Sequence, residues 1–131
     1  LQAGVGGLAA ATAAYLRHVW GDAPRMIVVE PAAAPALQAA IMAGQFVATS
    51  GPASCMGRLD CKEASLIALQ GLSRDADCFM TISEEAAQAV LPLLAEAGLA
   101  TSASGGAGLA ALMTAGLDPS ARVLCILSEE P

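Results

Sequence analysis

The glycines near the amino terminus are the residues whose type and spacing could do chemistry. Gly4, Gly6 and Gly7 stand together in the run AGVGGLA, directly before a stretch that favours helix. Glycines let the backbone turn tightly and bring several N–H groups toward one point, and the start of a helix adds partial positive charge. The pattern therefore predicts a site for a phosphate group. The alternative is a helix-start turn that packs closely against a neighbouring element.

The same glycines also fit the dinucleotide-binding pattern G-x-G-x-x-G/A, read as Gly4, Gly6 and Ala9. Glu30 ends the next apolar run, where such a site carries an acid for the ribose. The pattern requires a strand before the glycines, however, and we do not find one in the sequence. Glu30 followed by Pro31 equally suits a structural strand end. A Rossmann-type oxidoreductase domain that binds NAD or NADP is the alternative function.

The elements that must position these residues alternate between helix and strand along the chain. We expect strands at 26–30, 45–51, 77–82 and 123–127, and helices at 8–19, 33–43, 65–72, 84–96 and 109–116. Ser83 with two following glutamates predicts the N-cap of the fourth helix. Short apolar strands of this kind belong to a parallel sheet with helices on both faces. The predicted fold class is α/β, a three-layer αβα sandwich with a mainly parallel sheet.

Composition excludes several classes of function. The chain has 131 residues, 56% of them hydrophobic and 14% charged, with a net charge of −6. Few basic residues and 3% aromatics argue against a nucleic-acid partner. The longest uncharged stretch, 1–16, is shorter than the roughly 20 residues that cross a bilayer, so we expect no membrane association. Four unevenly spaced cysteines and one histidine predict no metal site, and the absence of a disulfide pattern indicates the cytoplasm.

An ordered set of motifs carries a family resemblance that covers nearly the whole chain. The motifs are GVGGLAAATAAY, VVEP, MGRLDCKEASLIALQGLSRDADCFMTISEEA, SASGGAGLAAL and CILSEE. In that order they resemble the carboxyl-terminal half of the fold-type II pyridoxal-phosphate enzymes, the tryptophan synthase β-like group, and within it diaminopropionate ammonia-lyase and its relatives. The resemblance implies that residues 1–131 are the carboxyl-terminal part of a large domain that binds pyridoxal 5'-phosphate.

The resemblance also implies which residues bind the cofactor. Ser128, just past the last predicted strand, would hydrogen-bond the pyridine nitrogen. Because a neutral hydroxyl does not enforce protonation of that nitrogen, the ring would be a moderate electron sink, which suits removal of an α-proton followed by rapid loss of a β-substituent. The cup for the cofactor phosphate would be formed by the backbone amides of Gly4, Val5, Gly6, Gly7 and Leu8.

The implied activity of the full-length enzyme is β-elimination. A small amino acid such as 2,3-diaminopropionate would give pyruvate and ammonia, and the enzyme would be a homodimer. The Schiff-base lysine of the family lies upstream of the glycines, outside this chain, so we nominate no catalytic residue. Lys62 lies among charges and is interpreted as a solvated surface lysine. We expect this chain alone to be inactive and to bind pyridoxal phosphate weakly or not at all.

Departures from the family pattern concern the substrate side of the site. Ala103 stands about where relatives often carry a glutamate, and Ala64 where a proline is usual. Cys61, in the run GRLDC, matches the family's cysteine loop, and the resemblance implies either a place near the substrate or a structural role. For Asp60 and Arg58, in the same run, a solvated loop is the default. A non-catalytic module that keeps the fold for association is a further alternative, because an apolar chain of this kind could expose patches that self-assemble.

Overall fold

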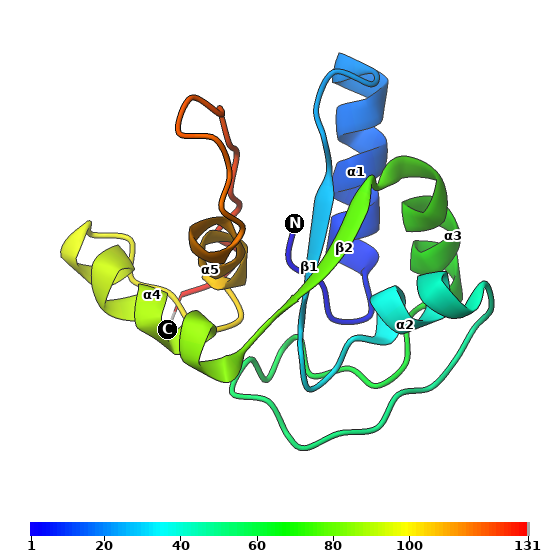
Figure 1. The fold of residues 1–131 in the computed structure, drawn as a ribbon, viewed down its shortest axis with the longest axis horizontal. Coiled ribbons are helices and arrows are strands. Elements are labelled where there is room, and N and C mark those ends of the chain that lie inside the picture. Colours follow the sequence, from blue (N-terminus) through cyan, green and yellow to red (C-terminus); the bar gives the residue numbers. More distant parts are fainter. Residues whose placement is uncertain (131) are drawn as a thin grey trace.

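The computed structural model describes residues 1–130 and has a parallel sheet at its centre (Figure 1). Strands β1 (Ile27–Pro31) and β2 (Cys78–Ile82) pair in parallel, with Ile27 opposite Cys78. Gln2 pairs in parallel with Val29 on the other side of β1. The amino-terminal residues thus lie alongside β1 and lead directly into the glycines.

Helices cover both faces of this sheet. On one side lie α1 (Gly7–Trp20), α2 (Ala36–Ala43) and α3 (Leu66–Asp75), and on the other lie α4 (Glu84–Glu96) and α5 (Ala107–Thr114) (Figure 1). Each face has its own cluster of buried side chains, with Val28 in the cluster of α1 to α3 and Val29 in the cluster of α4 and α5. The predicted α/β class, with helices on both faces of a parallel sheet, is confirmed.

Strand β1 explains why its sequence is a continuous apolar run. Val28 is fully buried on one face and Val29 is 2% exposed on the other. Side chains alternate between the faces of a strand, so a strand covered on both sides needs apolar residues at consecutive positions. Burial on both faces therefore accounts for the lack of polar alternation in the run.

Capping residues set the helix ends. Ser83 caps α4 as predicted, since the amide of Ala86 donates to Ser83 Oγ at 3.2 Å, and α4 has the predicted bounds. Pro92 lies inside α4 without ending it. Helix α2 begins at Ala36, three residues later than predicted, because Pro35 is its N-cap and the Glu30 carboxylate receives the amides of its first turn.

Two predicted strands are wrong. Residues 45–51 and 123–127 are irregular segments that form no ladder within residues 1–130. Residues 45–51 contact the neighbouring loop through Thr49, whose amide donates to the Lys62 carbonyl at 2.8 Å. A strand needs a partner whose backbone groups face its own, and an apolar run by itself does not supply one. The two segments therefore have the composition of strands without their pairing.

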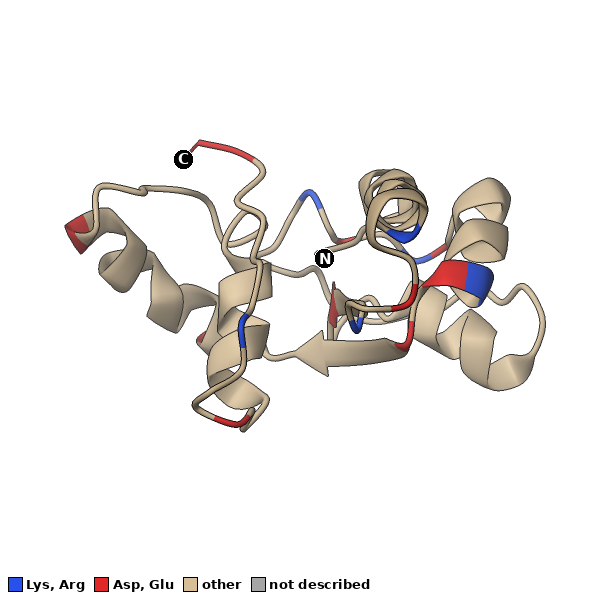
Figure 2. Ribbon diagram, turned by 90° about the horizontal axis from the view of Figure 1, so that it is seen from above, with Lys and Arg blue, Asp and Glu red and all other residues tan. Residues whose placement is uncertain are grey.

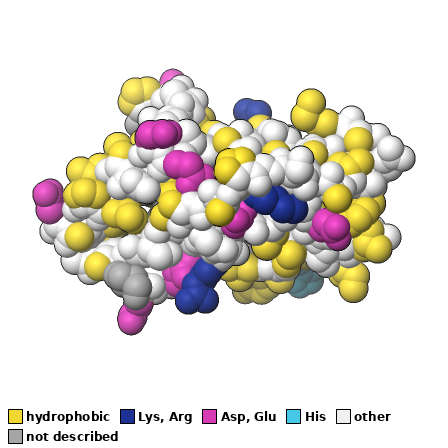
Figure 3. Space-filling view, turned by 90° about the horizontal axis from the view of Figure 1, so that it is seen from below, with side chains coloured by type: hydrophobic (Ala, Val, Ile, Leu, Met, Phe, Trp, Pro, Cys, Tyr) yellow, Lys and Arg dark blue, Asp and Glu magenta, His cyan; other side chains and the backbone are white. Residues whose placement is uncertain are grey.

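The surface of the described residues is mixed in character. Lysine and arginine residues are scattered along the ribbon and form no continuous run (Figure 2). Apolar side chains are spread over the face seen in Figure 3, and the most exposed of all, Met42 at 81% and Ile67 at 83%, lie on α2 and α3. None of the helices between residues 1 and 130 is long and apolar enough to cross a membrane.

Candidate functional site

The glycine loop, Gly4–Gly7, joins a strand-like segment to helix α1. The amide of Ala3 donates to the Val29 carbonyl at 2.8 Å, and the amide of Val29 donates to the Leu1 carbonyl at 2.9 Å. The sequence offered no strand before the glycines, and the structure corrects this, because three residues are enough to pair with an existing neighbour. The loop therefore leaves the carboxyl end of a parallel segment, where ligands bind in open α/β sheets.

Two of the glycines are required by the fold itself. A Cβ at Gly4 would lie 2.8 Å from the Arg58 carbonyl oxygen and 3.0 Å from Cys61 Sγ, so the loop approaches residues 58–61 too closely for a side chain. Gly6, the N-cap of α1, has φ of 96°, a conformation that side-chain-bearing residues rarely adopt. These two positions would be glycine with or without a ligand.

Gly7 is different, because its surroundings do not require glycine. A Cβ at Gly7 would meet no atom within 4 Å, and its φ is ordinary for a helix start. A methyl group there would project into the open space beside the loop. The missing side chain leaves room for a ligand to approach the backbone.

The amides of this loop are available to a ligand. Within residues 1–130, the backbone N–H groups from Gly4 to Ala9 donate a hydrogen bond to no acceptor. The first amides of a helix have no partner in the helix itself, and they carry the partial positive charge of its dipole. A phosphate is the kind of group that such converging amides bind.

These amides face a cavity of about 360 Å³, within the range of ligand pockets. Three chain segments line it. The first is the amino-terminal segment with the glycine loop and the start of α1, the second is the cysteine loop, and the third is the segment at Ser128 and Glu129. All six residues predicted to bind the cofactor are among the lining residues. The full lining is Gln2, Ala3, Gly4, Val5, Gly6, Gly7, Leu8, Ala9, Arg58, Leu59, Cys61, Ser128 and Glu129. Their roles in binding remain predictions.

Ser128 reaches this cavity from the far end of the chain. It follows the irregular segment 123–127, and Gln2 Nε2 donates to Ser128 Oγ at 3.0 Å and to the Ile126 carbonyl at 2.9 Å. The ends of the chain, far apart in sequence, thus meet beside the glycine loop. Sequence reasoning missed Gln2, Leu59 and Glu129, and the position of Gln2 just before the glycines was the one available signal.

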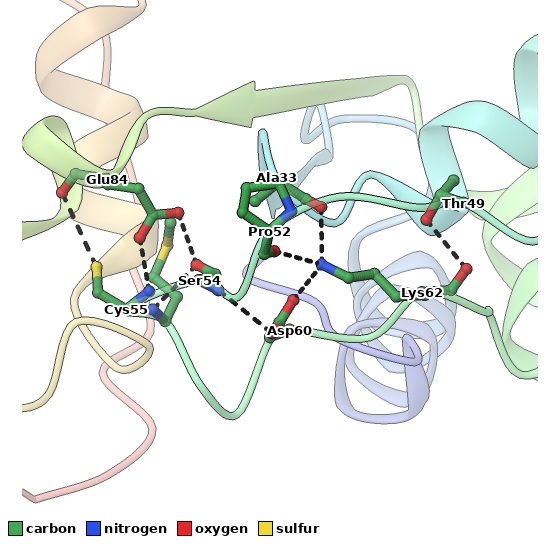
Figure 4. A network of polar contacts seen from close by, with 9 residues as sticks. Ala33, Thr49, Pro52, Ser54, Cys55, Asp60, Lys62 and Glu84 are labelled. Atoms are coloured by element: carbon green, nitrogen blue, oxygen red, sulfur yellow. Dashed lines mark hydrogen bonds and ion pairs between the residues drawn. The ribbon is translucent and has the colours of Figure 1, made fainter.

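Charged side chains hold the cysteine loop, residues 54–62, in place, and Glu84 and Lys62 are among those labelled in Figure 4. The Glu84 carboxylate, at the start of α4, accepts from Ser54 Oγ at 2.7 Å and from the amide of Cys55 at 2.6 Å. Arg58 forms an ion pair with Glu129, and the amide of Arg58 donates to Ser104 Oγ at 3.1 Å. These contacts place residues 58–61 against Gly4.

Lys62 also holds this loop, and the structure corrects its interpretation as a solvated surface lysine. Its Nζ donates to the carbonyls of Ala33 at 2.8 Å and Pro52 at 2.9 Å and to the Asp60 carboxylate at 2.5 Å (Figure 4). The hydrogen bond from Lys62 holds the pKa of the Asp60 carboxyl below its usual value. Lys62 does not line the cavity. The Lys62 amine therefore has a structural role, because it holds the cysteine loop through these hydrogen bonds.

Glu30 is also structural, which argues against the dinucleotide interpretation. Its carboxylate is 1% exposed and accepts from the amides of Leu37 at 2.7 Å and Gln38 at 2.8 Å. Burial raises the pKa of this carboxyl, and the two amide hydrogen bonds offset part of that rise. Both oxygens are occupied at the start of α2, so Glu30 presents no acid to a ribose.

Comparisons with known proteins agree with this geometry. The structure is similar to a threonine deaminase from T.th., with a TM-score of 0.81 at 24% identity over 89% of this chain and 43% of that one. An L-serine ammonia-lyase from Rhizomucor miehei gives a TM-score of 0.82 at 24% identity over 98% and 44%. Diaminopropionate ammonia lyase from Escherichia coli gives 0.76 at 26% identity over 86% and 30%.

The chain thus spans less than half the length of these three solved structures. No curated protein matches it in sequence. Residues 1–129 match the family described as pyridoxal-phosphate dependent enzyme, and the similar structures are fold-type II members of it. With its free amides, its cavity and this match over nearly its whole length, the chain belongs to the fold-type II pyridoxal-phosphate dependent enzymes.

Proposed function

We propose that residues 1–131 form the carboxyl-terminal part of the cofactor-binding large domain of an ammonia-lyase. The full-length enzyme would act by β-elimination on a small amino acid such as 2,3-diaminopropionate and release pyruvate and ammonia. The similarity to diaminopropionate ammonia lyase at 26% identity supports this choice of substrate. The observation that carries the proposal is that the unpaired amides of the glycine loop share one cavity with Ser128.

The residues around the cavity fit pyridoxal phosphate. The amides at the start of α1 suit its phosphate, and Gly7 leaves the space that the phosphate would occupy. Ser128, on the same lining, offers a hydroxyl for the ring nitrogen. When bound, the cofactor supplies an electron sink that makes the α-proton of an amino acid acidic and lets a β-substituent leave.

The glycine loop and Ser128 have binding and orienting roles in that proposal. The glycine loop holds the phosphate through neutral donors, and Ser128 sets the polarity at the ring nitrogen. The Schiff-base lysine would come from a segment outside residues 1–131. Lys62 does not suit that role, because its amine donates hydrogen bonds to three oxygens away from the cavity. We therefore expect this chain alone to be inactive and to hold the cofactor weakly or not at all.

The first test is an absorbance spectrum of the full-length protein, purified without added cofactor. A cofactor bound to a lysine absorbs in the visible range, well beyond the protein's own band, and its band shifts when an amino acid reacts with it. We expect such a band, a shift on adding 2,3-diaminopropionate, and release of ammonia and pyruvate. A protein with no band after incubation with pyridoxal phosphate would contradict the proposal.

The choice of substrate is tested by comparing three amino acids with one preparation of the full-length protein. L-serine, L-threonine and 2,3-diaminopropionate should be supplied at equal concentrations, with ammonia, the 2-oxo acid product and the chirality of the remaining amino acid all measured. We expect diaminopropionate to have the highest kcat/KM. Faster deamination of serine or threonine would overturn the choice of substrate, and racemisation without ammonia would overturn the lyase assignment.

The assembly and location of the enzyme are also proposals. We propose a homodimer, supported by the exposed apolar side chains of α2 and α3, and a cytoplasmic location, supported by four cysteines that are all free thiols. Light scattering of the full-length protein tests the first, since a monomer would contradict it. Recovery of the native protein in an exported fraction would contradict the second.

A further inference from the structure

We propose that Gln2 is a positioning residue that holds the Ser128 hydroxyl as a hydrogen-bond donor toward the cavity. The inference rests on the proposed function, since the receiving atom would be the ring nitrogen of the cofactor. Gln2 belongs neither to the glycine loop nor to the last segment, and it contacts both regions through its side chain. The argument depends on which atoms of the Gln2 amide face which neighbours.

The Gln2 side chain is enclosed by acceptors. The residue is 4% exposed, and its Nε2 lies 2.9 Å from the Ile126 carbonyl oxygen, 3.3 Å from the Gly105 carbonyl oxygen and 3.0 Å from Ser128 Oγ. These contacts cross sequence separations of 103 to 126 residues. One amide group therefore joins the start of the chain to the turn before α5 and to the end of the chain.

The two carbonyls decide the orientation of that amide. A backbone carbonyl can only accept a hydrogen bond, so the NH₂ end of the amide must face Ile126 and Gly105. The opposite orientation would place Oε1 against two other oxygens and leave all three without a proton. The NH₂ group has two hydrogens for three oxygens, so one goes to Ile126 and the other is shared between Ser128, at 3.0 Å, and the more distant Gly105, at 3.3 Å. The nitrogen cannot accept a hydrogen bond from Ser128, because an amide nitrogen has no available lone pair.

The direction of the Ser128 hydroxyl follows from this orientation. Because Gln2 donates to it, Ser128 Oγ is an acceptor in that contact, and its own hydrogen must point elsewhere. Within residues 1–130, Ser128 Oγ donates to no other group, and Ser128 lines the cavity. The hydroxyl hydrogen is therefore free to be presented to whatever occupies the cavity.

A hydroxyl held in this way favours one protonation state of a bound ring. An unprotonated ring nitrogen accepts the hydrogen, and every group is then satisfied. A protonated ring nitrogen would compete for the oxygen and leave the Ser128 hydrogen without an acceptor on the ring, which costs free energy. Gln2 should therefore lower the pKa of the ring nitrogen, through Ser128 and without touching the cofactor.

The experiment uses the full-length protein loaded with pyridoxal phosphate that carries ¹⁵N at the ring position. The ¹⁵N signal is followed against pH in the unaltered protein and in Gln2→Met, which keeps the side-chain length and removes the donor. The expected result is a rise of about one pH unit in the midpoint of ring-nitrogen protonation. An unchanged midpoint would overturn the proposal.

Gln38→Met is the matched control. Gln38 Nε2 also donates to a backbone carbonyl, that of Phe79 at 3.0 Å, and Gln38 does not line the cavity. This variant loses a comparable hydrogen bond and should leave the midpoint unchanged. An equal shift in both variants would show a general effect of lost stability and would count against Gln2.

A double variant separates positioning from a merely structural role. In the Ser128→Ala background the hydroxyl is gone, so Gln2→Met should produce no further shift of the midpoint. A second, additive shift would mean that Gln2 acts by another route, and it would overturn the inference.

Gln2→Met leaves two carbonyls unpaired, so a measurement on the unaltered protein is also needed. Neutron diffraction of the cofactor-free, deuterated full-length protein locates the Ser128 hydrogen directly. A deuterium directed into the cavity supports the proposal, and one directed at a protein acceptor overturns it. This result stands whether or not the protein binds pyridoxal phosphate, so failure of the proposed function is distinguishable from failure of this inference.

Discussion

The chain has two glycine-rich turns that each lead into a helix, and they differ in what happens to their amides. The glycine loop, Gly4–Gly7, leaves its N–H groups without acceptors within residues 1–130. In the second glycine cluster, residues 102–108, the amide of Gly105 donates to Ser102 Oγ at 3.1 Å and that of Gly106 to the Ser102 carbonyl at 2.9 Å. The amides of Gly105 and Gly106 are therefore satisfied by acceptors within the second turn.

The space around the two turns differs in the same sense. A Cβ at Gly7 would meet nothing within 4 Å, whereas one at Gly105 would overlap Thr101 Oγ1 and one at Gly106 would lie 3.2 Å from Leu94 Cδ1. The first turn opens on a cavity and the second packs against α4 and the end of the chain. Glycines before a helix therefore indicate a ligand site only where the amides remain unpaired.

The largest effect should come from filling the packed turn. Gly105→Ala places a methyl group against Thr101 and Glu129, and we expect it to lower the free energy of unfolding by about 3 kcal/mol, since the core there has no room. Urea unfolding of the full-length protein measures this. Gly57→Ala is the control, because a Cβ there meets no atom within 4 Å. Equal stability of the two variants would break the comparison.

Filling the open turn should affect binding and leave stability alone. Gly7→Ala adds a methyl group in the space proposed for the phosphate, and we expect the Kd for pyridoxal phosphate to rise about tenfold, or about 1.4 kcal/mol. The unfolding free energy should stay level or increase, because alanine is the better helix former. Fluorescence titration against Gly57→Ala measures the affinity. An unchanged Kd would remove Gly7 from the phosphate cup.

The tie between the packed turn and the end of the chain should have a smaller effect. Thr101 Oγ1 donates to the Glu129 carbonyl at 2.5 Å, next to Ser128. Thr101→Val removes that donor, and we expect a loss of about 1 kcal/mol in unfolding free energy. In the control Thr114→Val, the lost hydroxyl contacts carbonyls within helix α5, and the change should be smaller. If Thr114→Val loses as much unfolding free energy as Thr101→Val, the hydrogen bond from Thr101 to Glu129 has no special role.

The smallest effect should come from the ion pair that links the two regions. Arg58 pairs with Glu129, but the Arg58 side chain is 79% exposed, so water and salt screen the attraction. Arg58→Gln should change the unfolding free energy by less than about 0.5 kcal/mol. Urea unfolding at low and high salt measures it. A larger, salt-sensitive loss would show that charge, and not hydrogen bonding, joins the regions.

Local patterns predicted the parts of this fold that depend on neighbouring residues. Ser83 followed by two glutamates predicted both the cap and the bounds of α4, because a side-chain cap acts within one turn. The continuous apolar run at 26–30 predicted a strand buried on both faces. Segments 45–51 and 123–127 were wrongly predicted as strands, because pairing depends on a partner that composition does not reveal.

The candidate site divides in the same way. From the sequence alone, the family resemblance and the glycine spacing grouped Gly4 to Leu8 with Ser128, and the structure places all of them on one cavity. The solvated interpretation of Lys62 was wrong, because its three acceptors come from separate parts of the chain. The role of Gln2 had no sequence signal beyond its position just before the glycines.

The sequence by itself determined the α/β class, the Ser83 cap of α4 and the tight turn at Gly6, because each depends mainly on residues within a few positions of one another. Only the tertiary structure decided which amides stay free, which glycines are packed and which way the Ser128 hydroxyl is directed. Those outcomes depend on contacts such as Gln2 with Ile126, across 124 residues. Hydrogen bonds are short-ranged and directional, so such a contact exists only once the packed layers have brought both groups into place.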